Sequence, residues 1–177
     1  HRDLHSFPTR RSSDLRKYPA IHPLDSWSKY PGIMPRKAVE YAHGYLERSA
    51  EVGAMMKVVG EEGTSLDDYV YYLKGEFLDA VYLQQNSFDP VDASVSPERQ
   101  KAMFRLALRI LGADLELKDK EAARSWFYEV RQAFLDLNGA AEKSDLYGAS
   151  LSKVESLLLS KNPRYAAKAQ QILASLE

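Results

Sequence analysis

The chain has 177 residues, with 24 lysines and arginines against 25 aspartates and glutamates, and its formal net charge is −1. This balance gives no basic surface for nucleic acid or an anionic membrane, and no apolar run approaches the roughly 20 residues of a membrane-spanning helix. The absence of cysteine excludes disulfides and thiolate chemistry, and the length is sufficient for one domain with a hydrophobic core.

The first part of the chain divides into two segments without helical periodicity. Residues 1–15 resemble one reading-frame translation of a sequencing-library adapter, so we expect them to be non-native and exclude them from fold reasoning. The natural sequence is then expected to begin near Arg16 and to be truncated upstream. Residues 16–35 contain four prolines, and this density predicts an irregular entry segment or linker.

Cap residues and apolar spacing predict six helices in residues 36–177, which we expect to form one C-terminal helical domain. The predicted helices run from Pro35 to about Val59, from Ser65 to about Leu83, from Ser96 to Gly112, from near Asp119 to Gly139, over about Leu151–Leu159, and from Asn162 to near Leu176. The connections are mostly short, and the alternating β-branched pattern of strands is absent. The sequence therefore predicts an all-α bundle behind a Pro-rich entry segment.

Apolar residues at helical spacing predict which faces of two helices are buried. In the first helix the predicted core residues are Val39, Ala42, Leu46, Ala50 and Ala54. In the fourth helix they are Ala123, Trp126, Phe127, Val130, Phe134 and Leu137. The second helix carries four tyrosines, which cannot all face one core: Tyr69, Tyr71, Tyr72 and Tyr82. We therefore expect some of these tyrosines at a boundary with another domain or chain.

Several kinds of chemistry are excluded by the residue pattern. Outside residues 1–15 the histidines are His22 and His43, and neither has a second ligand at metal-binding spacing, so we predict no metal site. There is no Gly-x-Ser-x-Gly elbow and no Gly-x-x-x-x-Gly-Lys-[Ser/Thr] loop, so we predict no catalytic residue. Any nucleotide role must then concern the base and not the phosphates.

A run of three amides, Gln84, Gln85 and Asn86, ends the second predicted helix and leads to Phe88. Core packing has no use for three adjacent amides, because each buried amide needs several hydrogen-bond partners. A site that binds a flat polar ring would use them, but amides can also cap the end of a helix. The residues alone support these two interpretations equally.

Two sequence elements resemble the catalytic A subunit of V-type and archaeal A-type rotary ATPases. The first is the run from Tyr18 to Ser28, Tyr-Pro-Ala-Ile-His-Pro-Leu-Asp-Ser-Trp-Ser, and the second is Leu83-Gln-Gln-Asn86. F-type catalytic subunits have a similar Tyr-Pro-Ala run, but the second element and the long helical tail favour the V/A-type branch. His22 stands where this family more often has Asp or another polar residue.

The resemblance implies an ATP or ADP site to which this chain contributes the adenine end. Tyr18 would pack against the adenine ring, Phe88 would close the pocket, and Gln84, Gln85 and Asn86 would lie near it. Adenine has a π face and a donor–acceptor edge, so aromatic rings and amides suit it. Residues 16–35 would be the tail of the nucleotide-binding domain, and the phosphate and magnesium sites would lie upstream of this sequence.

The resemblance also implies a place in a proton- or sodium-translocating ATPase or ATP synthase. The helical domain would contact the B subunits of the catalytic head and the central shaft, on the cytoplasmic side and peripheral to the membrane. Residues Ser87–Pro97 would connect the pocket to the next helix, and the chain alone would be inactive. The alternative is a free-standing helical protein-interaction module without nucleotide binding.

Overall fold

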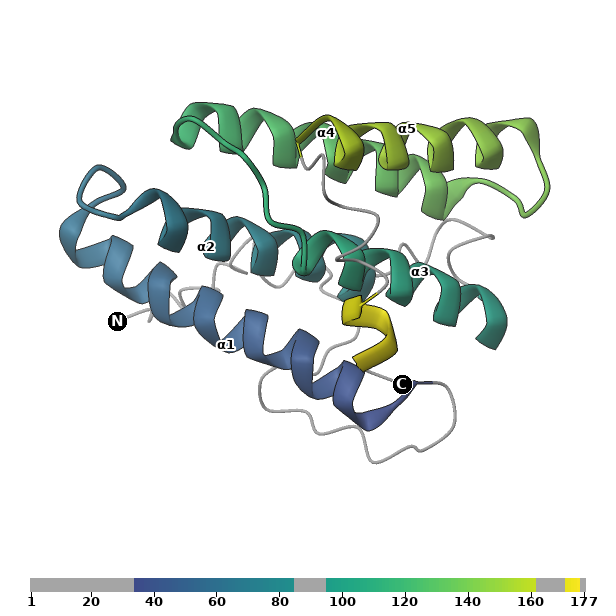
Figure 1. Cartoon of the computed structure of the whole chain (residues 1–177), viewed down its shortest axis with the longest axis horizontal. Coiled ribbons are helices and arrows are strands. Elements are labelled where there is room, and N and C mark those ends of the chain that lie inside the picture. Colours follow the sequence, from purple (N-terminus) through teal and green to yellow (C-terminus); the bar gives the residue numbers. More distant parts are fainter. Residues whose placement is uncertain (1–33, 85–94, 162–170, 176–177) are drawn as a thin grey trace, which may run out of the picture.

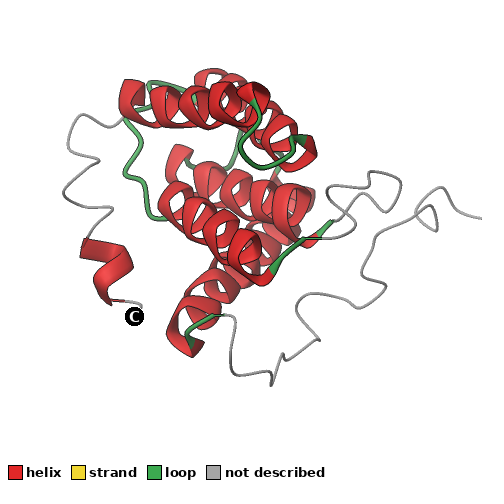
Figure 2. Cartoon of the chain, turned by 90° about the vertical axis from the view of Figure 1, so that its right-hand side faces the viewer, coloured by secondary structure: helices red, strands yellow, loops and turns green. Residues whose placement is uncertain are grey.

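The computed structural model describes residues 34–84, 95–161 and 171–175, and every regular element in these ranges is helical (Figure 2). The elements are α1 (Arg36–Val59), α2 (Leu66–Leu78), the π-helical turn η2 (Asp79–Leu83), α3 (Pro97–Leu111), α4 (Lys120–Gly139) and α5 (Asp145–Lys161), and residues 171–175 form a further helical turn. The predicted all-α class is confirmed. Residues 1–15 and the entry segment up to residue 33 lie outside the described residues.

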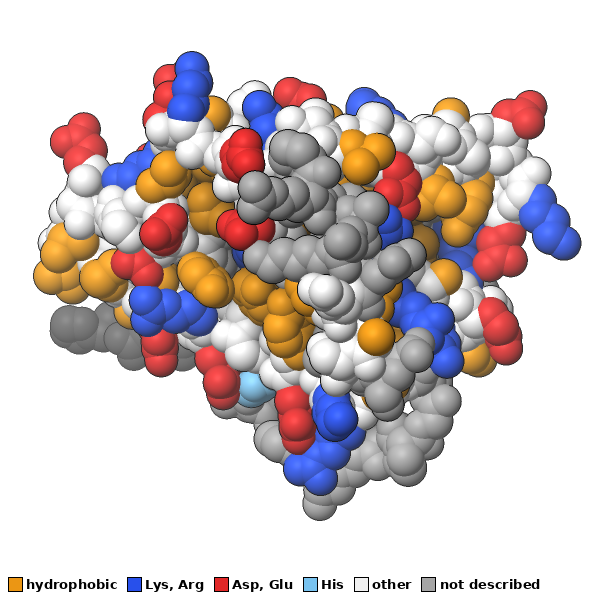
Figure 3. Space-filling view, viewed as in Figure 1, with side chains coloured by type: hydrophobic (Ala, Val, Ile, Leu, Met, Phe, Trp, Pro, Cys, Tyr) orange, Lys and Arg blue, Asp and Glu red, His pale blue; other side chains and the backbone are white. Residues whose placement is uncertain are grey.

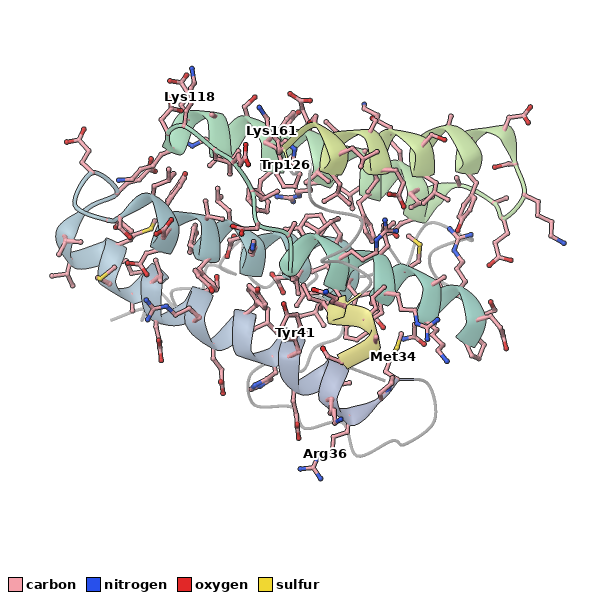
Figure 4. All side chains as sticks on the ribbon, viewed as in Figure 1. Met34, Arg36, Tyr41, Lys118, Trp126 and Lys161 are labelled. Carbon is pink, nitrogen blue, oxygen red and sulfur yellow. The ribbon has the colours of Figure 1, made fainter. Side chains whose placement is uncertain are left out.

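Two antiparallel helix pairs and α3 make up the bundle (Figure 1). Helices α1 and α2 form one pair, and α4 and α5 form the other, which packs on α2 and η2. The helical turn at residues 171–175 lies close to α3, since Ile172 approaches Gly112. Tyr41 points from α1 towards the same place (Figure 4), where its hydroxyl also lies beside Gly112.

The core lies between the two pairs and is formed largely by α3 and α4. All six residues of the predicted α4 stripe are buried, which confirms that prediction: Ala123, Trp126, Phe127, Val130, Phe134 and Leu137. The ring of Phe77 on α2 meets that of Phe134 edge-on, with 5.5 Å between centroids. Trp126 joins α4 to α5, because its indole Nε1 donates to the carbonyl of Leu157 at 3.1 Å.

The predicted core face of α1 is partly wrong. Ala42 is buried and Leu46 packs partly against the core, as predicted, but Val39, Ala50 and Ala54 are exposed. The buried residues of α1 are instead Ala38, Ala42, Ser49 and Val52. The face of α1 that meets α2 is thus rotated from the face that the apolar spacing predicts.

Close approach of α1 to α2 explains this rotation. The Ser49 hydroxyl donates to the carbonyl of Tyr72 at 3.0 Å, and a Cβ on Gly75 would overlap the Ser49 side chain. Small side chains are needed where two helix backbones come this near, and the buried hydroxyl finds its partner on the neighbouring helix. Apolar periodicity does not detect such a contact, because the residue that makes it is polar.

Three of the six predicted helix starts are confirmed by cap bonds. The side chains of Ser65, Ser96 and Asp119 accept the backbone N–H three residues on, at 3.1, 3.2 and 2.7 Å. The fifth helix is longer than predicted, because it begins at Asp145 and ends at Lys161. Its first turn contains Gly148, which weakens the apolar signal there.

Candidate functional site

The helix that leads to the amide run ends in a π-helical turn. The backbone N–H of Gln84 donates to the carbonyl of Asp79 at 3.0 Å, a bond that spans five residues. The Gln84 side chain also folds back, with Nε2 donating to Asp79 Oδ2 at 2.7 Å. This second bond matches the helix-capping interpretation of the amide. Turns of this kind are rare and occur often at functional sites.

Gln84 is the one predicted site residue that the structure describes. Tyr18, Gln85, Asn86 and Phe88 lie outside the described residues, as does the greater part of the predicted connection from Ser87 to Pro97. The structure therefore gives the position from which the amide run departs, at the end of η2. It does not bring the five predicted residues together or separate them.

Asn138, near the end of α4, holds the π-helical turn in place. Its side-chain Nδ2 donates to the carbonyl of Val81 at 2.7 Å, within η2. Val81 is buried, and buried carbonyls need a hydrogen-bond donor, which Asn138 supplies here. Sequence reasoning assigned Asn138 only to the end of a helix. Its partner lies 57 positions earlier in the chain, so the residues around Asn138 give no indication of this contact.

Arg99, in the first turn of α3, is bound to the same end of α4. The side chain is 6% exposed, and Nη2 donates to the carbonyls of Leu137, Asn138 and Ala140 at 3.0, 2.8 and 2.8 Å. The last carbonyls of a helix lack intrahelical donors and carry partial negative charge, so a cation there is stabilising. No pattern in the sequence indicates this role for Arg99.

Tyr82 belongs to the π-helical turn, and its side chain packs against α3. Its ring packs against that of Phe104, with 4.8 Å between centroids. Burial raises the pKa of Tyr82 to about 12, and a hydrogen bond with Gln100 partly opposes this rise. The phenol is therefore neutral at physiological pH, and the turn that precedes Gln84 carries both this aromatic ring and the acidic side chain of Asp79.

A second polar cluster lies between α1 and α2. The rings of Tyr45 and Tyr71 stack with centroids 5.5 Å apart, and Lys74 Nζ lies 5.4 Å from the Tyr45 ring. Burial, followed by the hydrogen bond with Tyr41, raises the pKa of Tyr45. Tyr69 is 3% exposed and Tyr71 is 42% exposed, so the tyrosines of α2 do not share one core. The expected place of some of them at a boundary with another domain or chain stays a prediction.

No metal centre is found in the part of the chain that the structure describes, where no three His, Cys, Asp or Glu residues are grouped to hold an ion. His43 lies beside Glu47 at 3.3 Å, one helical turn away. Acidic and basic side chains are interspersed on the face shown in Figure 3, without a continuous basic surface. None of the helices in the described ranges has the length and hydropathy needed to cross a membrane.

Comparison with known proteins decides which family these features belong to. Residues 38–125, which extend from α1 into α4, match the C-terminal domain of V and A type ATP synthase. The chain belongs to this family. It is 44% identical to V-type ATP synthase alpha chain 1 of Treponema pallidum over 96% of its own length and 29% of the relative's.

Two further alpha chains show the same relation. Identity is 47% to that of Treponema denticola, over 93% of this chain and 28% of the relative. Identity is 51% to that of Borrelia duttonii, over 86% of this chain and 27% of the relative. The chain thus spans less than a third of the length of the alpha chains it matches. The matches confirm the resemblance to the C-terminal part of this subunit.

Proposed function

We propose that this chain provides the C-terminal helical part of the catalytic alpha subunit of a V/A-type ATPase or ATP synthase that translocates protons or sodium ions. Its similarity to alpha chains over nearly its whole length supports this function. The observation that carries the proposal for the site is the π-helical turn: it ends at Leu83 and is capped by Gln84, immediately before Gln85, Asn86 and Phe88. An anchored turn of unusual geometry at the start of a polar run suits a binding site.

In the proposed pocket this chain binds the adenine end of ATP or ADP. Tyr18 stacks on the ring, Phe88 closes the pocket, and Gln84, Gln85 and Asn86 lie near the ring edge. Each stacked aromatic contributes roughly 1–3 kcal/mol, by analogy with base stacking in single-strand binders. The sequence has no phosphate-binding loop, so the phosphates and magnesium are held by other parts of the alpha subunit.

The proposed partners are the B subunits of the catalytic head and the subunits of the central shaft. Residues 87–97 connect the adenine pocket to α3, so nucleotide binding and the position of the bundle would influence one another through this connection. The subunit would act on the cytoplasmic side, as a peripheral part of the enzyme.

The test replaces the stacking tyrosine in a complete subunit. A chimera would join the preceding part of the Treponema denticola alpha chain to residues 16–177 of this chain. We expect Tyr18→Ala to weaken ATP binding about ten- to hundredfold, because it removes one stack of roughly 1–3 kcal/mol. Tyr18→Phe keeps the ring and should bind nearly as the parent does. Unchanged affinity of Tyr18→Ala in equilibrium binding would remove this residue from the pocket.

A further inference from the structure

We propose that η2 is a conformational switch between a π-helical and an α-helical register, and that the end of α4 holds it in the π form. In the α form, α2 would continue as one regular helix through Leu83, which is the helix that the sequence predicts. The switch is built from residues of η2, α3 and α4 and needs no nucleotide. It goes beyond the proposed function and does not depend on it.

The sequence of η2 does not itself require a π-helical turn. Residues 79–83 read Asp-Ala-Val-Tyr-Leu and contain neither the glycine nor the proline that would interrupt a regular helix. The Gln84 N–H donates to the carbonyl of Asp79, and in an α-helix it would donate to that of Ala80 instead. Because Gln84 keeps a backbone bond in either form, the contacts of side chains decide between the two registers.

One contact that selects the π form lies within the turn. The Gln84 side chain donates from Nε2 to Asp79 Oδ2 at 2.7 Å, across five positions of the chain. Neighbouring side chains on an α-helix are three or four positions apart, and a pair five positions apart points to different faces. This bond therefore belongs to the π form and is lost when the register changes.

Two contacts from other helices select the same form. Asn138 Nδ2, near the end of α4, donates to the carbonyl of Val81 at 2.7 Å. This carbonyl belongs to the last turn of its helix and to a buried residue, so it needs a donor from outside the helix. The ring of Tyr82 packs on that of Phe104 in α3, with 4.8 Å between centroids. Both contacts depend on the rotation of Val81 and Tyr82 about the helix axis, which the α form would change.

The position of Asn138 is set in turn by Arg99, in the first turn of α3. Arg99 is 6% exposed, and its Nη2 donates to the carbonyls of Leu137, Asn138 and Ala140. The end of α4 thus controls η2 through one short hydrogen bond. A displacement of about 1 Å would stretch that bond beyond hydrogen-bonding distance and release the π form. Gln84 would then turn by roughly 100°, the angle between successive residues of an α-helix.

The first test is the structure of the chimeric alpha chain with Asn138→Ala, assembled into its ATPase. We expect the Gln84 N–H to donate to the carbonyl of Ala80 in place of Asp79, and the side-chain bond between Gln84 and Asp79 to be lost. The matched control is Ser49→Ala, which also removes one side-chain-to-carbonyl bond between helices, but between α1 and α2. It should keep η2 in the π form. A Gln84 N–H still bonded to Asp79 in Asn138→Ala would overturn the switch.

Asn138→Leu serves if Asn138→Ala does not fold. Leucine keeps roughly the size of the asparagine side chain but lacks its donor, so the same change of register is expected and the same unchanged bond would contradict it. These structures are determined without ATP. Failure of the adenine pocket would leave their outcome unaffected, and failure of the switch would leave the pocket standing.

A double-mutant cycle in this chain tests the switch in solution. Asn138→Ala and Gln84→Ala each remove one bond that selects the π form, and the two bonds have different partners, Val81 and Asp79. Once Asn138→Ala has released the turn, Gln84→Ala has no bond left to remove. The double variant should therefore lose clearly less stability in urea than the two single losses together, whereas Asn138→Ala with Ser49→Ala should lose their sum. A full sum for Asn138→Ala with Gln84→Ala would mean that η2 does not switch as a unit.

Discussion

Two buried cations, Lys74 and Arg99, each donate hydrogen bonds to backbone carbonyls at the C-terminal end of another helix. Lys74 is 7% exposed, and its Nζ donates to the carbonyl of Ala113 at 2.8 Å, just beyond α3. Arg99 does the same at the end of α4. Carbonyls in these positions lack intrahelical donors, and buried charges require polar partners. Each cation thus connects its own helix to the end of another helix. The two partners lie about forty residues apart in the sequence, so the local sequence gives no sign of the contact.

At the same scale, Tyr82 predicts a loss of stability in alkali. Its folded-state pKa of about 12 lies above the ordinary value of 10.0, so the folded protein holds the phenol proton more tightly. The resulting stabilisation is complete below about pH 10 and is lost as the pH rises from 10 towards 12. In Tyr82→Phe the free energy of unfolding should fall less steeply in this window, by up to roughly 1.4 kcal/mol per pH unit.

Urea denaturation at a series of pH values above 9 would measure this difference in slope. Tyr128→Phe is the matched control, because the Tyr128 side chain is 65% exposed and its loss should leave the slope as in the parent. Equal slopes for the parent and Tyr82→Phe would show that the buried phenol is not the titrating group.

At the scale of elements, the packing of α1 on α2 depends on the absence of a side chain at Gly75. A Cβ there would overlap the Cβ and Oγ of Ser49. Gly75→Ala should therefore destabilise the protein by about 1–3 kcal/mol, as overpacking does, although alanine favours the helix by roughly 1 kcal/mol. Gly44→Ala is the control in the same helix pair: nothing lies within 4 Å of its Cβ, so it should stabilise by about 0.5–1 kcal/mol. Denaturant unfolding of both variants would measure the expected fall in the free energy of unfolding for Gly75→Ala and the expected rise for Gly44→Ala.

A double-mutant cycle that combines Gly75→Ala with Ser49→Gly completes this experiment. Removing the Ser49 side chain makes room for the new Cβ, so the loss from Gly75→Ala should be smaller in that background. If the two substitutions are simply additive, the close contact does not set the packing of α1 on α2.

Three helix starts in this chain were predictable because their determinants are local. Ser65, Ser96 and Asp119 each bond to a backbone N–H three residues away, and the sequence contains both partners side by side. The buried face of α1 was not predictable in the same way. Ser49 is buried because its hydroxyl bonds to the backbone of another helix, a contact that the sequence of α1 alone does not show.

For the candidate site, the sequence placed Gln84 at the end of a helix but gave no sign of the π-helical turn or of its anchors. The bond from Asn138 to Val81 and the bonds from Arg99 to the end of α4 join residues 38 to 57 positions apart. The adenine roles of Tyr18 and Phe88 came from family resemblance, since an aromatic residue alone does not specify its ligand.

At the scale of the molecule, polar contacts link the α4–α5 pair to the α1–α2 pair and to α3. Lys120 and Arg124 on α4 bind Glu61 in the turn between α1 and α2, through its carbonyl and its carboxylate respectively. Arg109 on α3 forms a two-pronged pair with Glu155 on α5, at 2.6 and 2.8 Å. Such geometry fixes orientation as well as adding stability. These contacts and the shared core favour movement of the bundle as a unit, as proposed for its role beside the shaft.

The last prediction concerns ATP hydrolysis by this chain in isolation. The sequence contains no Gly-x-x-x-x-Gly-Lys-[Ser/Thr] loop, and in the part of the chain that the structure describes no three His, Cys, Asp or Glu residues are grouped to hold an ion. We therefore expect this chain to supply no phosphate-binding site, and the proposed adenine pocket by itself would lower no barrier to hydrolysis. Residues 16–177 expressed alone should release phosphate from ATP no faster than a protein-free sample, while the chimeric subunit in its assembled ATPase turns over. Circular dichroism and a cooperative thermal transition would establish that the isolated chain is folded. Phosphate release that coelutes with the folded chain would mean that catalytic groups lie within this sequence.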